Sequence, residues 1–315
     1  RYPNQHEQVW SQGAAEDNHY WFPCYDSPND RATSEMIVTV NEKFTAVSNG
    51  KLIGKKNNPA MQTTTYHWLE SKPHPSYLIS IAVCDYLQLK DSSGGGLEIS
   101  NYVYPEQQKD APRSFRNVPK MISFFEKCTG FKYPWEKFGH VVVDEFIFSG
   151  MENTSIVTLT DKTIPDSRAH LDFPSDGLIA HELAHQWYGD MITCEDWSHA
   201  WLNEGFAVFS EMLYAEHLGG TTAYLEAVRS TAQRYRISDT RNEGIFPPHA
   251  AMPEMVAAYL EAIRAVQPRG PYYLTSWSAG GIFSYALARA LHERGEPLGL
   301  VMLFDTPLPS IYDSV

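Results

Sequence analysis

The feature that most constrains this chain of 315 residues is the pentapeptide His-Glu-Leu-Ala-His at residues 181–185. Residues four apart lie one above the other on a helix, so a helix here places His181 and His185 on one face. Both imidazoles can then bind the same Zn²⁺ ion. Glu182 follows the first histidine directly, where its carboxylate can stand beside a water and act as a general base. The pentapeptide therefore predicts a helix that carries a zinc site.

A second segment, Trp-Leu-Asn-Glu-Gly-Phe-Ala at residues 201–207, supplies the third ligand. Eighteen residues separate His185 from Glu204, enough for a turn and the start of an antiparallel second helix. Apolar neighbours on both sides of Glu204 predict that its carboxylate is partly buried, where an unpaired charge would be costly. His181, His185 and Glu204 thus predict one Zn²⁺ per chain with three protein ligands and an open position for water.

These motifs resemble those of the M1 family of zinc aminopeptidases (gluzincins), and a third motif strengthens the resemblance. Residues 148–153, Phe-Ser-Gly-Met-Glu-Asn, resemble the family's Gly-Ala-Met-Glu-Asn motif and depart from it at Ser149 and Gly150. The resemblance implies that Glu152 binds the free α-amino group of a peptide while the adjoining edge strand pairs with its backbone. A carboxylate opposite an ammonium fixes cleavage one residue from the N-terminus. The resemblance implies substrate binding by Gly150, Met151, Glu152 and Asn153.

The region before this motif has the pattern of β structure. Short β-rich runs separated by Asn-Gly, Asn-Pro and Gly-Gly-Gly turn signals predict an N-terminal β domain over residues 1–104. Its sequence resembles the N-terminal β domain of the M1 family, in which Gln12 matches a glutamine that lines the S1 pocket. That domain normally starts earlier, so we expect this chain to be truncated at its start. The resemblance implies a thermolysin-like α+β zinc peptidase domain over residues 105–245.

The residues from 246 to 315 follow a different pattern. A strand, a turn, a helix and an apolar strand follow one another, an order typical of α/β structure. This stretch resembles part of the thioesterase domains that end polyketide and nonribosomal peptide synthases, which are α/β-hydrolases. Ser278 matches the nucleophile and Asp305, 27 positions later, matches the triad acid. The resemblance implies an incomplete site, because His292 lies within the helix after the serine and a Ser–Asp pair lacks its base.

The sequence lacks one element of the M1 pattern. The family carries an oxyanion-stabilising tyrosine in a Tyr-x-Lys-Gly setting, and this chain has no lysine after Lys162. Loss of one oxyanion donor costs about 10²–10³ in turnover, so hydrolysis is less secure than zinc binding. The simplest account is a join near residue 245 between an M1-like piece and a thioesterase-like fragment, and a divergent M1 tail is the alternative.

Composition limits the partners of the chain. It has 25 basic and 38 acidic residues, a formal net charge of −13, which argues against nucleic acid and anionic membranes as partners. No apolar run reaches the roughly 18 residues of a membrane span. No signal peptide is visible, which slightly favours a cytoplasmic, soluble protein. The four cysteines lie far apart without the CxxC spacing of a metal or redox motif.

The sequence therefore predicts a multidomain zinc aminopeptidase acting on peptides with a free N-terminus. Two alternatives stay open: a chain that binds zinc without activity, and a serine thioesterase that uses Ser278. The preferred N-terminal side chain of the substrate and the oligomeric state are not predicted by any of these motifs.

Overall fold

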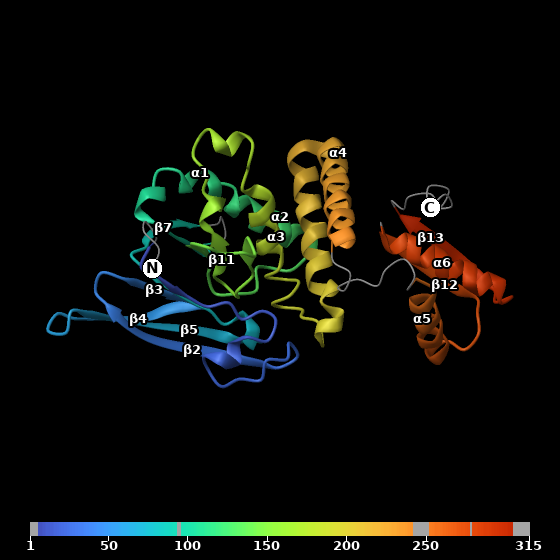
Figure 1. Ribbon diagram of the computed structural model, residues 1–315, viewed down its shortest axis with the longest axis horizontal. Coiled ribbons are helices and arrows are strands. Elements are labelled where there is room, and N and C mark those ends of the chain that lie inside the picture. The colour runs from blue at the N-terminus through green and yellow to red at the C-terminus, as the bar shows by residue number, and fades with distance from the viewer. Residues whose placement is uncertain (1–5, 93–95, 242–251, 278, 305–315) are drawn as a thin grey trace. The chain divides into compact units, whose positions relative to one another are not determined.

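The computed structural model describes residues 6–92, 96–241, 252–277 and 279–304. The chain forms two compact units, Arg1–Val228 and Arg229–Val315 (Figure 1). Each unit has a cluster of buried apolar side chains of its own. All residues predicted to bind zinc lie in the first unit.

The first part of the first unit is built from two antiparallel sheets of three strands each. One sheet has the order β2-β5-β4 and the other has the order β1-β6-β3. Side chains over residues 63–70 of β5 alternate between half-buried and buried positions, as expected for a strand with one face on the core. The predicted β-rich N-terminal region is confirmed. The strands and short 3-10 helices are β1 (Val9–Trp10), η1 (Asn18–Tyr20), β2 (Arg31–Asn41), β3 (Thr45–Ser48), β4 (Lys51–Asn58), β5 (Thr63–Pro75), η2 (Ser76–Leu78) and β6 (Ile81–Cys84).

A mixed sheet of five strands, with the order β10-β11-β9-β8-β7, forms the centre of the first unit. The neighbours β8, β9 and β11 run parallel, whereas β7 and β10 pair antiparallel at the two edges. Strands before and after residue 104, the expected domain boundary, therefore share one sheet. The five strands are β7 (Leu87–Ser92), β8 (Glu98–Val103), β9 (Phe138–Val143), β10 (Gly150–Met151) and β11 (Val157–Thr160).

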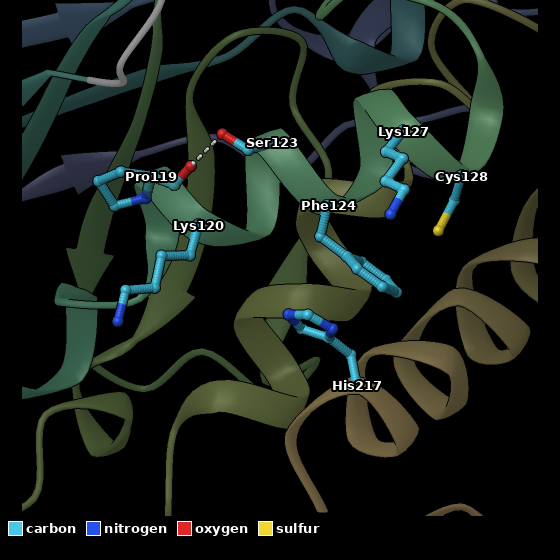
Figure 2. A pocket seen from close by; sticks show the side chains of 7 residues that line it. All are labelled: Pro119, Lys120, Ser123, Phe124, Lys127, Cys128 and His217. Carbon is cyan, nitrogen blue, oxygen red and sulfur yellow. Dashed lines mark hydrogen bonds between the residues drawn. The ribbon is translucent and has the colours of Figure 1, made fainter. Parts of the chain in front are cut away.

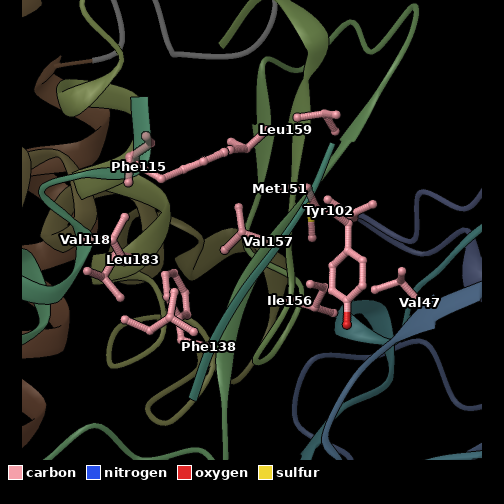
Figure 3. Packing of buried hydrophobic residues seen from close by; sticks show 14 of the residues in the cluster. Val47, Tyr102, Phe115, Val118, Phe138, Met151, Ile156, Val157, Leu159 and Leu183 are labelled. Atoms are coloured by element: carbon pink, nitrogen blue, oxygen red, sulfur yellow. The ribbon is translucent and has the colours of Figure 1, made fainter. Parts of the chain in front are cut away.

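Helices pack against this mixed sheet through apolar side chains. Figure 3 shows Val118 and Leu183 from helices beside Phe138 and Val157 from strands, all in one buried cluster. No helix among the described residues is both long enough and apolar enough to cross a membrane. The helices are η3 (Pro105–Gln107), α1 (Ala111–Phe115), α2 (Val118–Thr129), η4 (Asp161–Thr163), η5 (Ala169–Leu171), α3 (Asp176–Ala184), η6 (Trp197–His199) and α4 (Trp201–Arg241).

The sequence pattern from residue 175 to 236 predicts helices over 175–189, 201–217 and 221–236, and the last two are both present. They form the continuous stretch α4, which is kinked at Gly220, where φ is 68°. The predicted helix over 175–189 is shorter than expected, because α3 ends at Ala184. The N–H of His185 still donates to the carbonyl of His181, four residues earlier, whereas those of Gln186 and Trp187 donate to carbonyls three residues earlier, the tighter 3-10 pattern. Gly189 then has a φ of 128°.

After the end of α4, the described residues of the second unit form two further helices and two parallel strands. β12 (Tyr272–Trp277) and β13 (Leu298–Phe304) pair in parallel and are joined through α6 (Ala279–Glu293). α5 (Met252–Val266) and α6 pack on each other and share a small apolar cluster with β12. Both predicted strands of this segment are confirmed. Parallel strands connected by a helix are the βαβ arrangement.

Two ionisable side chains are buried between the sheets of the first unit. The ammonium nitrogen of Lys137 donates to the backbone carbonyls of Ser48 and Ser155 at 3.3 and 3.2 Å. It also lies 5.2 Å from the ring centre of Trp68. Burial lowers the pKa of Lys137 from 10.5 to about 7, and burial raises the pKa of Glu70 from 4.5 to about 6. The folded chain therefore favours the neutral form of both groups relative to an exposed position.

We predict that Lys137 makes a contribution to the stability of the first unit that increases as the pH rises from 7 to 9. In this range the unfolded chain keeps the proton on Lys137 and the folded chain loses it, so unfolding takes up a proton. The contribution of Lys137 to the free energy of unfolding then rises by about 2 kcal/mol between pH 7 and pH 9. Glu70 is ionised in both states above pH 7 and adds little to the slope.

Denaturant titrations followed by tryptophan fluorescence measure this effect, because seven of the eight tryptophans lie in the first unit. Lys137→Met removes the titrating group and keeps an apolar stem of similar length. The difference in free energy of unfolding between the wild type and this variant should shift in favour of the wild type between pH 7 and 9, and a constant difference would contradict the assignment.

Candidate metal centre

The three predicted ligands come together where α3 ends and α4 begins. The Nε2 atoms of His181 and His185 lie 3.1 Å apart, and Oε2 of Glu204 lies 3.5 and 3.6 Å from them. A triangle with these sides has a centre about 2 Å from each atom, which matches the Zn–N and Zn–O distances in proteins. These residues form one of the two His/Glu groups that could hold a metal ion within the described ranges. The donor set therefore fits zinc.

Contacts on the far side of each imidazole fix its orientation. Nδ1 of His185 lies 2.9 Å from the backbone carbonyl of Tyr188, which can only accept, so this nitrogen carries the proton. Nε2 of His185 then keeps its lone pair for a metal. Nδ1 of His181 lies 3.8 Å from Oε2 of Glu211 on α4. A carbonyl or carboxylate behind the ring is the usual support of a metal-binding histidine.

The expected partial burial of Glu204 is wrong, because 58% of its side chain is exposed. The buried face of α4 follows the positions i, i+4, i+7 and i+11, and Glu204 stands just beside this face. The apolar residues near Glu204 in the sequence do not bury its side chain, because Trp201 and Phe206 are themselves exposed. The carboxylate lies at the open rim of the site. The buried positions among residues 201–233 of α4 are Asn203, Ala207, Ser210 and Tyr214.

Negative charge dominates this site. Burial alone would lower the pKa of His185, yet Glu152, Glu204 and Glu182 together raise it to about 10. Partial desolvation by the groups around its carboxylate would raise the pKa of Glu204, and hydrogen bonds to the two histidines hold this pKa below its usual range. Burial raises the pKa of Glu182 to about 7. Three carboxylates around two imidazoles favour a bound cation.

Glu182 is buried and lies against the edge strand β10. A Cβ atom at Gly150 would stand only 2.0 Å from its Oε1, so the carboxylate fills the space that a side chain there would need. Glu152, Glu182 and His185 form the second His/Glu group, with ligand atoms within 4.8 Å of one another. The departure from the family motif at Gly150 thus brings Glu182 and β10 into close contact.

The other predicted substrate residues, Met151, Asn153 and Gln12, have the following surroundings. Met151 belongs to the apolar cluster, and Asn153 is buried, with Oδ1 accepting from the Thr158 hydroxyl at 2.8 Å. Gln12 accepts from the backbone N–H of Ala14 at 3.4 Å. The following segment contacts η2, because the Asn18 side chain of η1 donates to the carbonyl of Ser76 in η2 and to that of Ile79 directly after it.

The residues of the thioesterase-like site are not brought together by the described structure. Ser278 and Asp305 lie outside the described residues, and His292 lies in the last turn of α6.

Three residues that hold Glu152 directly or through a neighbour were not foreseen from the sequence. Gln186 donates from Nε2 to the Glu152 carbonyl at 3.2 Å, while its Oε1 accepts from the Ser155 N–H at 2.9 Å. The Tyr77 hydroxyl lies 3.4 Å from Oε1 of Glu152, and Asn203 contacts Tyr77. Gln186 and Asn203 could have been found as neighbours of predicted ligands. No local pattern indicates Tyr77.

A separate pocket of about 660 Å³ lies between α2 and α4 (Figure 2). Phe124 forms its wall and stacks on His217, with ring centres 4.7 Å apart. The lining contains none of the predicted metal ligands and is composed of Pro119, Lys120, Ser123, Phe124, Lys127, Cys128 and His217.

We predict that Ser149→Gly stabilises the first unit by roughly 0.5–1 kcal/mol, measured by denaturant unfolding. Ser149 is exposed and has a φ of 65°, which is unfavourable for a residue with a Cβ atom. Ser155 is the matched control, since its φ is 66° but its buried hydroxyl accepts from the Gly50 N–H at 2.7 Å. Ser155→Gly should destabilise, and a less stable Ser149→Gly would contradict the prediction.

Comparison with known families finds three matching segments along the chain, the last two of which overlap over residues 221–245. Residues 1–78 match the Peptidase M1 N-terminal domain, residues 113–245 match the Peptidase family M1 domain, and residues 221–314 match a Thioesterase domain. The resemblances to M1 peptidases and to thioesterases are thereby confirmed.

Similar curated proteins are aminopeptidases. Glutamyl aminopeptidase of Bos taurus is 32% identical over 203 residues, that of Homo sapiens 30% over 200, and aminopeptidase M1 of Arabidopsis thaliana 28% over 201. Each alignment covers 62% of this chain and 21%, 21% and 23% of the relative. The chain thus spans about a fifth of the length of these relatives. It combines two segments similar to M1 aminopeptidases with a third segment similar to thioesterase domains.

Proposed function

We propose that this chain is a zinc-dependent aminopeptidase that removes the N-terminal residue of peptides. The observation that carries the proposal is a buried carboxylate, Glu152, beside a donor set that fits zinc. A peptide's α-ammonium and its first carbonyl are one residue apart, so an anion next to a metal centre suits an exopeptidase. The similarity to aminopeptidases supports this function.

The metal would be held by His181, His185 and Glu204. When bound there, zinc supplies a Lewis acid that polarises a carbonyl and lowers the pKa of water. The backbone carbonyl of Tyr188 lies behind the imidazole of His185, and the carboxylate of Glu211 lies behind that of His181. Such groups orient an imidazole toward a metal.

The chain's own residues would do the remaining work. Glu182 takes a proton from the attacking water and passes it to the leaving amine. Glu152 binds the substrate ammonium, and this contact sets which peptide bond is cleaved. The strand β10 lies at the edge of its sheet and offers backbone groups to an extended peptide. We also propose that residues 105–245 form a thermolysin-like domain.

The thioesterase similarity favours a second candidate, a serine hydrolase at Ser278. Its proposed acid is Asp305, and a base is needed to take the serine proton. His292, in the last turn of α6, is the histidine nearest in sequence after the serine. Fourteen residues of helix would span about 20 Å, beyond hydrogen-bond reach. We therefore rank this activity below the aminopeptidase.

We predict that Glu204→Ala loses most of its zinc, because one of three ligands is removed at an exposed position that tolerates alanine. Glu182→Gln should keep its zinc and lose hydrolysis, because it retains the shape of the side chain and cannot accept a proton. Elemental analysis and turnover of an aminoacyl reporter measure the two effects. Ser278→Ala is the control and should hydrolyse at the wild-type rate. Equal zinc loss in Glu182→Gln and Glu204→Ala would show that the roles are misassigned.

We also predict that a free peptide is cleaved at least tenfold faster than its N-acetylated form, since acetylation removes the charge that Glu152 binds. Glu152→Gln should slow cleavage of the free peptide and so reduce the ratio of its cleavage rate to that of the N-acetylated peptide. Rates are compared by mass spectrometry of the released residue. Equal rates on both peptides with the wild-type chain would favour an endopeptidase instead.

A further inference from the structure

A line of hydrogen bonds connects the helix of the third zinc ligand to the proposed ammonium anchor. Asn203 precedes Glu204 on α4 and donates from Nδ2 to the Tyr77 hydroxyl at 3.3 Å. The hydroxyl in turn donates to Oε1 of Glu152 at 3.4 Å. All three linked side chains are buried. The metal side and the anchor side of the site are therefore in contact through Tyr77.

The direction of these bonds follows from their ends. Oδ1 of Asn203 accepts from the Cys194 N–H at 3.0 Å, so the amide nitrogen faces Tyr77 and donates. A hydroxyl that receives this donor has one proton left, and that proton points to the carboxylate of Glu152. Burial and the nearby carboxylates raise the pKa of Tyr77 well above 10, so the hydroxyl keeps its proton as a donor.

Tyr77 is held in place before any substrate arrives. Its ring packs edge-on against Trp197, with centres 4.9 Å apart and an angle of 78° between planes. The carbonyl of the following residue, Leu78, accepts from the amides of Asn49 and Asn153 at 2.9 and 3.3 Å. The short helix η2 is thus fastened to the segment that carries Glu152, and the hydroxyl cannot swing away without breaking these contacts.

Glu152 is held at two points as a result. Gln186 binds its backbone carbonyl, and Tyr77 binds one carboxylate oxygen. A carboxylate offers about four lone pairs, so one bond from Tyr77 leaves acceptors for an ammonium. A fixed carboxylate binds a charged partner better than a mobile one, because less side-chain entropy is lost on binding.

We propose that Tyr77 is a positioning residue that orients the Glu152 carboxylate for the α-ammonium of the substrate, a role that rests on the proposed aminopeptidase function. Tyr77 acts through Glu152 and makes no bond to the reacting carbonyl. Its loss should weaken recognition of the free amine and leave the metal in place.

The test uses Tyr77→Phe in the full chain loaded with zinc. Its probes are an aminoacyl hydroxamate with a free amine and the N-acetylated form of the same compound, both measured by calorimetry. Tyr77→Phe should weaken the free-amine probe roughly tenfold and leave the acetylated probe within twofold. Zinc content should equal that of the wild type, and KM for a free peptide should rise more than kcat falls.

Tyr66→Phe is the matched control, because this buried tyrosine donates to the Phe44 carbonyl at 3.2 Å, a contact that involves neither Glu152 nor the ligands. It should leave the affinity for both probes unchanged. In a Glu152→Gln background, Tyr77→Phe should have no further effect on the ratio of the two affinities. This comparison separates positioning of Glu152 from a general loss of packing.

The outcomes distinguish the two proposals. A wild-type chain that binds both probes equally would overturn the aminopeptidase function together with the role of Tyr77. A wild-type preference for the free amine that persists in Tyr77→Phe would overturn the role of Tyr77 alone. Equal weakening of both probes by Tyr77→Phe would also overturn it, since it would indicate a structural effect.

Discussion

The crowding of three carboxylates around two imidazoles at the end of α3 is the constraint on which the rest of the site depends. The facing Nε2 atoms of His181 and His185 are 3.1 Å apart, and both keep lone pairs if their far nitrogens carry protons. Such an arrangement is stable only with a positive charge among the carboxylates. The short α3, the turn at Gly189 and the loop to α4 together place the imidazoles and Glu204 around this point.

The sequence predicted the elements and ligands that depend on local spacing. His181 and His185 share a helix face because they are four residues apart, and the strands of the second unit follow runs of β-forming residues. The exposure of Glu204 was predicted wrongly, since burial on α4 depends on which face meets the core. Local hydrophobicity around one residue does not contain that information.

The contacts that hold Glu152 could not be predicted for a related reason. Tyr77 is 75 residues from Glu152 and 126 residues from Asn203, and it meets them only because η2 packs beside the mixed sheet. Gln186 is closer to prediction, because it follows His185 directly. Its target, the carbonyl of Glu152, belongs to a segment recognised only by resemblance. Pairings at such separations depend on the complete fold, and a single sequence gives no periodic signal for them.

The two departures from the family motif, Ser149 and Gly150, act in opposite directions on the same edge strand. Ser149 adopts a left-handed conformation that disfavours a side chain, whereas Gly150 leaves the space that the Glu182 carboxylate fills. A peptide paired along β10 would then pass Glu182 on its way to Glu152. In the proposed function, the group that binds the amine therefore follows this short strand directly, and the group that moves the proton packs against it.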